Sequence, residues 1–542
     1  MKSYDAGPTD PPILEETIGA NFERTVAADP AAEALVEVAR QRRWTYGELN
    51  AEVDLIARGL IALGVQRGER VGIWAPNCAE WLIVQYGTAK IGAILVNINP
   101  AYRTHELAYA LNQSGVRTLI SATAFKTSDY ARMVDEVRRG CGSLTDVVFL
   151  DTDDWDALRE RGLSVPVDEL RSRSASLNNR DPINIQYTSG TTGFPKGATL
   201  SHRNILNNGF FTTELIGLGP ADRLCIPVPF YHCFGMVLAN LGCTTHGATM
   251  VIPAPVFDAG ATLAAIDAER CTGVYGVPTM FIAMLGHPDF SAFDLSSLRT
   301  GIMAGSVCPV EVMKRCVAEM NMTEVAIAYG MTETSPVSCQ TLIDDDLERR
   351  TATVGRAHPH VEIKVVDPDT GEVLERGQPG EFCARGYSVM LGYWRDDAHT
   401  RDVIDGDGWM HSGDLAVMRE DGYCNIVGRL KDVVIRGGEN VYPREIEEFL
   451  LTHPDIDEAQ VVGVPDERYG EESCAWIRMK AGRPPLDAEA VRAFATGELA
   501  RYKIPRYVLV VDAFPMTVTG KIRKVDMREE SIRLLGLSSP DD

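Results

Sequence analysis

The stretch at residues 187–197 reads Tyr-Thr-Ser-Gly-Thr-Thr-Gly-Phe-Pro-Lys-Gly and combines glycines, hydroxyl side chains and one lysine. Glycines let a backbone turn sharply and bring its N–H groups close to an anion. The hydroxyls add further hydrogen-bond donors, and the lysine adds a point charge. The stretch therefore predicts a loop that wraps a polyphosphate, formed by Thr188, Ser189, Gly190, Thr191, Thr192, Gly193, Lys196 and Gly197.

This stretch differs from the P-loop of nucleotide-hydrolysing proteins. A P-loop has Gly-Lys followed directly by Ser or Thr, so that the hydroxyl meets Mg²⁺ at the start of a helix. Here Pro195 precedes Lys196 and a glycine follows it, which disfavours a P-loop motor or GTPase. A flexible linker is the alternative interpretation. However, Ile183, Ile185 and Tyr187 alternate with polar residues, and this alternation predicts a strand that leads into the loop.

The composition indicates a large globular protein. A chain of 542 residues, 45% of them apolar, allows about two to four domains and a large core. The formal net charge of −23 leaves no basic field for nucleic acid or anionic lipid. We therefore expect no nucleic-acid partner, and we expect local lysines, backbone N–H groups and a metal ion to hold any anionic substrate.

The cysteines and the apolar segments predict a cytoplasmic location. The twelve cysteines include no Cys-x-x-Cys pair, and such a pattern is typical of reduced core residues rather than of disulfides or zinc ligands. The N-terminus has no hydrophobic segment of signal-peptide length. Residues 224–257 lack Asp, Glu, Lys and Arg, but prolines and glycines interrupt them, so we expect buried strand and helix and no transmembrane segment.

Strand-like and helix-like segments alternate over the first three hundred residues. Residues 70–74 and 92–98 are short apolar runs, and residues 80–89 between them have a helical pattern. This alternation predicts an α/β fold, in which a large N-terminal domain consists of stacked, largely parallel sheets covered by helices.

The C-terminal fifth of the chain has a different pattern. Helices are predicted from Pro443 onward and at 488–502, and strands at 460–464, 475–479 and 507–511. These elements suffice for a small, mobile α+β domain. Because a charged turn lies at residues 428–432, we place the domains at 1–430 and 431–542.

Six motifs follow one another in order along the chain. They are the 187–204 stretch, Tyr329-Gly-Met-Thr-Glu-Thr334, Ser412-Gly-Asp414, Gly428-Arg-Leu-Lys-Asp432, Arg436-Gly-Gly-Glu439 and Pro515-Met-Thr-Val-Thr-Gly-Lys-Ile522. The series resembles the adenylate-forming superfamily, and within it the medium-chain acyl-CoA synthetases. The resemblance implies that a carboxylic acid attacks the α-phosphate of ATP, giving an acyl-adenylate and pyrophosphate, and that coenzyme A then displaces AMP.

The same resemblance assigns roles around the nucleotide. Glu333 is expected to hold Mg²⁺, a hard cation that prefers oxygen ligands, while Thr332 contacts the α-phosphate and Thr188, with the 190–197 loop and Lys196, holds the β- and γ-phosphates. Asp414 is expected to accept hydrogen bonds from the ribose hydroxyls. The other expected ATP or AMP contacts are Gly305, Ser306, Tyr329, Gly330, Met331 and Arg429. Core packing is the alternative for Tyr329, and a plain turn residue is the alternative for Asp414.

Lys521 resembles the catalytic lysine of the superfamily, which bridges the substrate carboxylate and the α-phosphate. For the second half-reaction, the resemblance implies that the C-terminal domain rotates about Lys431, withdraws Lys521 and brings Gly437 and Gly438 to line a tunnel for coenzyme A. Glycines at that point permit a close backbone approach to the ligand.

Residues 230–236, Phe-Tyr-His-Cys-Phe-Gly-Met, match the acyl-binding segment of related synthetases. His232 is expected to orient the acyl carboxylate, and a buried structural histidine is the alternative. The expected apolar wall consists of Phe234, Met236, Val237, Tyr275, Val277, Met303 and Met331. No aspartate occupies the segment, which argues against an amino acid substrate. The resemblance to the medium-chain acyl-CoA synthetases implies a medium-chain fatty acid, and the sequence leaves its chain length open.

Other functions remain open at this point. A free-standing ligase that loads an acyl carrier protein in trans is the closest alternative, and an oxygen-dependent luciferase-like activity is a further one. A non-catalytic nucleotide sensor would not need the full set of charge-neutralising residues. The sequence leaves open whether the protein is a monomer or a homodimer.

Overall fold

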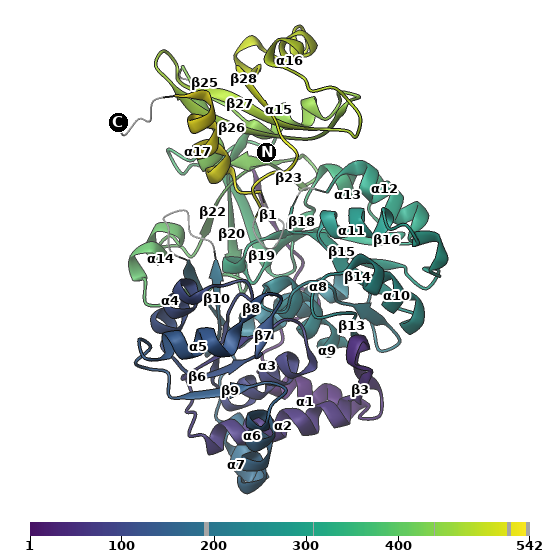
Figure 1. Ribbon diagram of the computed structural model, residues 1–542, viewed down its shortest axis with the longest axis vertical. Helices are drawn as coiled ribbons and strands as arrows, with labels where there is room; N and C mark the ends of the chain where they lie inside the picture. The colour runs from purple at the N-terminus through teal and green to yellow at the C-terminus, as the bar shows by residue number, and fades with distance from the viewer. Residues whose placement is uncertain (189–194, 307, 438, 517–521, 538–542) are drawn as a thin grey trace. The chain divides into compact units, whose positions relative to one another are not determined.

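The computed structural model describes all residues except 189–194, 307, 438, 517–521 and 538–542 (Figure 1). The chain forms two compact units. The large unit comprises Tyr4–Ile363 and Cys383–His411, and the small unit comprises Met1–Ser3, Lys364–Phe382 and Ser412–Asp542. The predicted domain boundary between residues 430 and 431 stays a prediction.

A seven-stranded sheet in the large unit carries the stem of the 187–197 stretch. Its order is β21-β11-β10-β5-β4-β6-β9, and β10, β5, β4, β6 and β9 run parallel. The antiparallel strands β11 and β21 complete one edge. The bounds are β4 Arg70–Trp74, β5 Ile94–Asn97, β6 Val116–Ser121, β9 Asp146–Phe149, β10 Pro182–Thr188, β11 Lys196–Ser201 and β21 Gly392–Tyr393.

A nine-stranded sheet forms the second layer of the large unit. Its order is β18-β17-β16-β15-β14-β12-β13-β2-β3, with six parallel central strands. The bounds are β2 Glu33–Glu37, β3 Arg42–Thr45, β12 Arg223–Cys225, β13 Thr249–Ile252, β14 Gly273–Gly276, β15 Thr300–Ala304, β16 Glu324–Gly330, β17 Val337–Gln340 and β18 Arg356–Ala357. Two largely parallel sheets confirm the predicted α/β class.

Helices cover and separate these sheets. The helix α3 is buried along its whole length, as expected for a helix that is apolar on most sides. The helix α2 begins at a capping box in which Thr45 and Glu48 bond reciprocally. The bounds are α1 Ile18–Ala28, α2 Tyr46–Ala62, α3 Ala79–Ile91, α4 Thr104–Ser114, α5 Tyr130–Arg138, α6 Asp153–Ser164, α7 Val167–Ala175, α8 His202–Leu215, α9 Gly242–His246, α10 Ala259–Glu269, α11 Pro278–Leu285, α12 Val310–Glu319, α13 Leu347–Ala352 and α14 Asp397–Val403.

The apolar span 224–257 folds as the sequence predicts. It contains β12, the π-helix η2 (Phe234–Leu241), α9 and β13, so strand and helix alternate within it. Among the residues that the structure describes, no helix has the length and apolarity needed to cross a membrane.

The small unit ends in a sheet of order β25-β24-β27-β26, with β28 paired to β27. The bounds are β24 Val434–Arg436, β25 Glu439–Val441, α15 Pro443–Leu450, β26 Ile456–Asp466, β27 Gly470–Met479, α16 Ala488–Ala495, β28 Tyr507–Val510 and α17 Lys524–Leu535. These elements confirm an α+β C-terminal part, but the predicted 488–502 helix is too long. The helix α16 ends at Ala495, because Gly497 adopts a φ of +93°, which an α-helix cannot contain.

Two histidines of the large unit lie in its interior. His202 is fully buried and its Nδ1 accepts a hydrogen bond from the Ile18 backbone N–H at 3.2 Å. His358 is equally buried and lies 3.3 Å from the hydroxyls of Thr212 and Tyr387. Burial lowers the pKa of His202 to about 4 and the pKa of His358 to about 3.

These depressed pKa values predict acid sensitivity. Both values lie below the ordinary histidine pKa near 6.5, so the unfolded chain binds protons first as the pH falls. The free energy of unfolding is therefore highest above about pH 6.5 and decreases as the pH falls toward pH 4. The substitution His202→Asn keeps a hydrogen-bond acceptor that does not titrate. It should reduce the loss of unfolding free energy between pH 7 and pH 4 by roughly 3 kcal/mol. Urea unfolding at both pH values measures this, and an unchanged loss in the variant would contradict the role of His202.

Candidate functional site

The strands β10 and β11 hold the stem of the predicted phosphate loop. Their antiparallel pairing places Thr188 opposite Lys196, and the Thr188 hydroxyl lies 3.4 Å from the Lys196 carbonyl oxygen. The structure thus brings these two predicted residues together. The predicted loop residues Ser189, Gly190, Thr191, Thr192 and Gly193 lie outside the described residues.

The helix α4 contacts both stems of this loop. The Tyr187 hydroxyl donates to Gln113 Oε1 at 2.6 Å, on the side where the chain enters the loop. The Tyr109 hydroxyl donates to the Pro195 carbonyl at 3.0 Å, on the side where it leaves. Because both bonds come from one helix, α4 fixes the separation of the two stems.

Glu333 joins this cluster from a distant part of the chain. It lies on the short helix η4 (Thr332–Thr334), and only 5% of its surface is exposed. Its Oε1 lies 3.3 Å from the Thr188 hydroxyl, and it accepts a hydrogen bond from the Tyr393 hydroxyl at 2.9 Å. The carboxylate predicted to hold a metal ion is thus adjacent to the predicted phosphate-loop stem.

Tyr393 is a site residue that the sequence interpretation missed. Its ring lies 5.3 Å from the Lys196 Nζ in a cation–π contact, while its hydroxyl donates to Glu333. Burial, together with the adjacent carboxylate of Glu333, raises the pKa of Tyr393, so the hydroxyl stays protonated and remains a donor. Only the pairing of β21 with β11, which aligns Tyr393 with Ala198, places it here.

The hydrogen bonds of the Glu333 carboxylate are compatible with binding of a hard cation. Two hydroxyls engage Oε1, and among the described residues none donates a hydrogen bond or forms an ion pair to Oε2. A buried carboxylate is costly unless it is paired with a cation or coordinates a metal. Glu333 therefore has the chemistry of a Mg²⁺ ligand.

The predicted adenine contacts follow the ends of two neighbouring parallel strands. Gly305 and Ser306 follow β15, and Tyr329 and Gly330 end β16, which pairs with β15. The carboxyl ends of parallel strands meet at one edge of the sheet, so these segments share that edge. Gly330 has to be glycine, because a Cβ there would lie 1.8 Å from the Pro336 carbonyl oxygen.

The predicted acyl segment is buried around η2. Phe234 stacks on Tyr275, with ring centroids 5.5 Å apart, and the buried Met236 and Val237 belong to the same core. Val277 is partly buried and packs against the same core, as does Met331. The predicted wall residue Met303 is buried in a different cluster, where its sulfur lies 3.1 Å from Cys308 Sγ. The structure brings Phe234 and Tyr275 together as an apolar surface.

One ring nitrogen of His232 accepts a hydrogen bond from the backbone. Its Nδ1 accepts from the Phe234 backbone N–H at 3.2 Å, which places the ring proton of a neutral imidazole on Nε2. The next residue, Cys233, links the segment to the nucleotide side, since its Sγ lies 3.9 Å from the Thr332 hydroxyl. His232 thus has the tautomer that can donate a hydrogen bond to a carboxylate.

The small unit carries the remaining predicted residues. Asp414 on β22 (Met410–Met418) faces Arg429 on β23 (Cys424–Arg429), and Asp414 Oδ1 forms an ion pair with Arg429 Nε at 3.0 Å. Lys431 lies on the short helix η5 (Leu430–Asp432), and Gly437 turns with a φ of +60° after β24. Gly438 and Lys521 lie outside the described residues.

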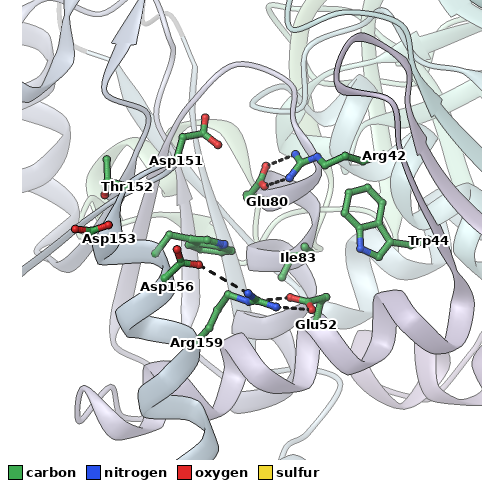
Figure 2. A pocket seen from close by; sticks show the side chains of 11 residues that line it. Arg42, Trp44, Glu52, Glu80, Ile83, Asp151, Thr152, Asp153, Asp156 and Arg159 are labelled. Carbon is green, nitrogen blue, oxygen red and sulfur yellow. Dashed lines mark hydrogen bonds and ion pairs between the residues drawn. The ribbon is translucent and has the colours of Figure 1, made fainter.

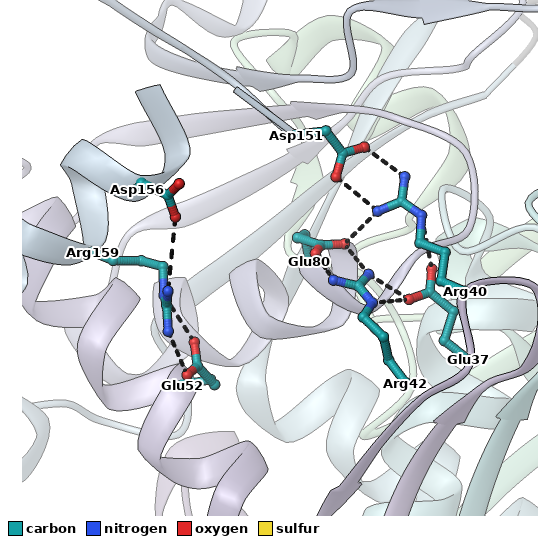
Figure 3. Close-up of polar contacts among 8 residues, drawn as sticks. All are labelled: Glu37, Arg40, Arg42, Glu52, Glu80, Asp151, Asp156 and Arg159. Carbon is teal, nitrogen blue, oxygen red and sulfur yellow. Dashed lines mark hydrogen bonds and ion pairs between the residues drawn. The ribbon is translucent and has the colours of Figure 1, made fainter. Parts of the chain in front are cut away.

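A pocket of about 510 Å³ lies elsewhere in the large unit, against β3, α2, α3 and α6 (Figure 2). None of its eleven described lining residues is a predicted site residue. Most of its charges are already paired: Arg42 Nη2 donates to Glu80 at 2.9 Å and Arg42 Nε donates to Glu37 at 2.7 Å (Figure 3). This ion-pair network ties β3 to α3 and is structural.

Comparisons with known proteins identify the family. Residues 22–394 match the AMP-binding enzyme family, and residues 445–521 match the AMP-binding enzyme C-terminal domain. The chain belongs to the AMP-binding enzyme family. The match confirms the resemblance that the six motifs predicted.

The relatives of this AMP-binding enzyme span its whole length. YngI of Bacillus subtilis (strain 168) is 48% identical over 97% of this chain and 99% of its own. Medium-chain acyl-CoA ligase ACSF2, mitochondrial, of Danio rerio is 45% identical over 99% of this chain and 91% of its own. The crystal structure of ATP-bound MatB from Rhodopseudomonas palustris has a TM-score of 0.84 at 29% identity, covering 96% of this chain and 100% of its own.

The ion-pair network of this AMP-binding enzyme predicts a strong effect of Arg42→Met. Loss of the cation leaves Glu37 and Glu80, whose side chains are only 3% and 7% exposed, with just the longer ion pairs to Arg40 at 3.8 Å. Breaking such a buried pair costs about 3 kcal/mol of unfolding free energy at pH 7. The loss should be smaller at pH 5, because burial raises the pKa of Glu37 and protonation removes a charge that Arg40 alone compensates only in part. Urea unfolding measures both values.

Arg159→Met is the matched control for this experiment. Arg159 pairs with Glu52, whose side chain is 27% exposed, so the variant should lose less than about 1 kcal/mol. Equal losses in the two variants would contradict the distinction between buried and exposed pairs.

The contacts of Tyr393 predict its effect on nucleotide binding. Tyr393→Phe removes the donor to Glu333 and keeps the ring under Lys196, so affinity for magnesium–ATP should fall roughly tenfold, as for a lost bond to a charged group. Tyr393→Leu removes both contacts and should weaken binding further. Calorimetric titration measures these affinities.

Tyr4→Phe is the control for Tyr393. The Tyr4 hydroxyl donates to Glu362 at 2.6 Å in an exposed pair, and neither residue belongs to the site. Its magnesium–ATP affinity should match the wild type, and a wild-type affinity in both Tyr393 variants would refute the role of Tyr393.

Proposed function

We propose that this protein is an AMP-forming acid–CoA ligase, which converts a carboxylic acid to an acyl-adenylate with release of pyrophosphate and then transfers the acyl group to coenzyme A. The observation that carries the proposal is the meeting of the half-buried Thr188 and Lys196 with the buried Glu333 in one cluster. The membership in the AMP-binding enzyme family and the acyl-CoA ligase relative support it.

In the first half-reaction the acyl carboxylate has to approach the α-phosphate of ATP, and both groups are anions. Lys196 and the hydroxyl donors at the loop stem reduce the charge on the phosphates, in a site dry enough for them to act strongly. Mg²⁺ held by Glu333 would supply further neutralisation of phosphate charge when bound. Thr332 and Lys521, by family resemblance, would contact the α-phosphate as the acyl carboxylate attacks it.

The acid is proposed to be a medium-chain fatty acid. His232 presents a donor tautomer that would orient the carboxylate, and the stacked Phe234 and Tyr275 offer an apolar surface to the chain. Burial of each CH₂ contributes about 0.8 kcal/mol, which favours a medium chain over acetate. The name of the ACSF2 relative agrees with this length.

The second half-reaction is proposed to use a rotation of the residues after the 430–431 boundary about Lys431. Gly437 and Gly438 would then line the passage for coenzyme A, while Lys521 leaves the adenylate. Asp414 and Arg429, now paired with each other, would exchange part of that contact for the ribose hydroxyls.

The compartment is proposed to be cytoplasmic. All twelve cysteines are buried and none forms a disulfide, as is typical of a reducing compartment. The ACSF2 relatives carry a mitochondrial designation in their names, so fractionation of cells that express the chain decides between the two.

Product analysis tests the proposed function. The wild-type protein, given ATP, Mg²⁺, octanoate and coenzyme A, should release pyrophosphate and form octanoyl-CoA. Lys521→Ala should lose roughly two powers of ten in adenylation, because it removes a charge at the reacting phosphate. It should still convert supplied octanoyl-adenylate to the thioester. Acylation of a holo-carrier protein without any acyl-CoA would instead favour the carrier-loading ligase.

A further inference from the structure

Buried amide side chains hold the segment that carries His232 and Met236. Asn77 Nδ2 donates to the Val228 carbonyl at 2.9 Å and its Oδ1 accepts from the Phe230 N–H at 2.8 Å. Gln85 Nε2 donates to the Met236 carbonyl at 3.0 Å. Both amides are 3% exposed. A buried amide is costly without partners. Asn77 and Gln85 both bond the backbone of this segment, and Gln85 Oε1 also accepts a hydrogen bond from Asn240 Nδ2 at 2.9 Å.

Two further amides contact the Met236 side chain itself. Asn97 Nδ2 lies 3.1 Å from the Met236 sulfur and Gln186 Nε2 lies 3.3 Å from it. Asn97 Nδ2 also donates to the Tyr231 carbonyl, directly before His232, at 3.0 Å. A thioether is a weak acceptor, so these contacts add little stability by themselves. Their effect is on the position of the Met236 sulfur.

Methionine is normally an adaptable side chain. It has three rotatable bonds and fills irregular spaces, so an unconstrained methionine wall accepts ligands of several shapes. Here Met236 is 2% exposed, so close packing restricts its side chain, and two N–H groups at 3.1 and 3.3 Å favour one position of its sulfur. The wall of the proposed acyl site is therefore held in one shape.

The two amides occupy register-paired positions in the seven-stranded sheet. Gln186 on β10 lies opposite Asn97 on the parallel strand β5. Asn184 Nδ2 donates to Asn97 Oδ1 at 2.9 Å and so orients the Asn97 amide. Gln186 also precedes Thr188 of the phosphate-loop stem by two residues, on the same face of the strand. One strand thus connects the nucleotide site to the acyl site.

We propose that Asn97 and Gln186 determine the chain-length selectivity of the acid, acting as positioning residues through the thioether of Met236. The proposal rests on the proposed ligase function, because it assigns the acyl chain to the Met236 wall. A fixed sulfur gives a pocket of fixed depth, and loss of either amide lets Met236 repack around longer chains.

Steady-state kinetics on a series of saturated acids tests the proposal, with ATP and coenzyme A saturating. The measured quantity is the ratio of kcat/KM for the preferred acid to kcat/KM for the acid four carbons longer. Gln186→Met, which keeps the length of the side chain and removes the donor, should reduce this ratio by roughly fivefold or more. The KM for ATP should stay unchanged. A ratio within twofold of the wild type overturns the proposal.

A double-mutant cycle tests whether Gln186 acts through Met236. Met236→Leu removes the sulfur and keeps a similar volume. In that background Gln186→Met should produce no further change in the ratio, because its contact is already gone. Independent, additive changes would show that Gln186 acts by another route and would overturn the proposal. If Gln186→Met does not fold, Gln186→Leu is measured in the same way.

Asn207→Leu is the matched control. Asn207 on α8 is a fully buried amide that bonds the Leu14 backbone at 2.7 and 3.0 Å and the Arg203 carbonyl at 2.9 Å, and among the described residues no hydrogen bond joins its side chain to Met236. It should lower the unfolding midpoint and leave the selectivity ratio unchanged. An equal loss of selectivity in Asn207→Leu would assign the effect to general destabilisation and overturn the proposal. A wild-type protein that forms no acyl-CoA from any acid would refute the ligase function instead.

Discussion

The buried carboxylate of Glu333 is the constraint on which the proposed nucleotide site depends. A carboxylate that is only 5% exposed has lost most of its hydration, and the protein replaces that hydration with the hydroxyls of Thr188 and Tyr393. Neither hydroxyl carries a positive charge. The site therefore retains a negative charge that favours a cation, and it places that charge beside Lys196 and the phosphate-loop stem.

The fold assembles this cluster by strand pairing rather than by proximity in the sequence. Thr188 and Lys196 face each other because β10 and β11 form a hairpin, and Tyr393 joins them because β21 pairs with β11. Glu333 follows β16 in the other sheet. The helix α4 fixes the hairpin on both sides through Tyr109 and Gln113. Rigid elements thus position each group, which preorganised electrostatic stabilisation requires.

The proposed acyl site also depends on the strand β10. Successive side chains of a strand point to opposite faces, so Gln186 and Thr188 share a face while Tyr187 points toward α4. One residue of β10 contacts Glu333 and another contacts Met236. The two binding regions are therefore in a fixed register, because a strand does not stretch.

The sequence by itself determined the α/β class, which depends on local composition and period, and it predicted a phosphate-binding character for residues 187–197. It placed the end of α16 wrongly, because helical spacing continues past Gly497 and does not reveal its left-handed φ. The pairing of β10 with β11 decided that Thr188 faces Lys196. Only the tertiary structure decided the roles of Tyr393, Asn97 and Gln186. A lone tyrosine or buried amide has no local sequence signature. Its role depends on contacts with strands and helices that lie far away in the chain.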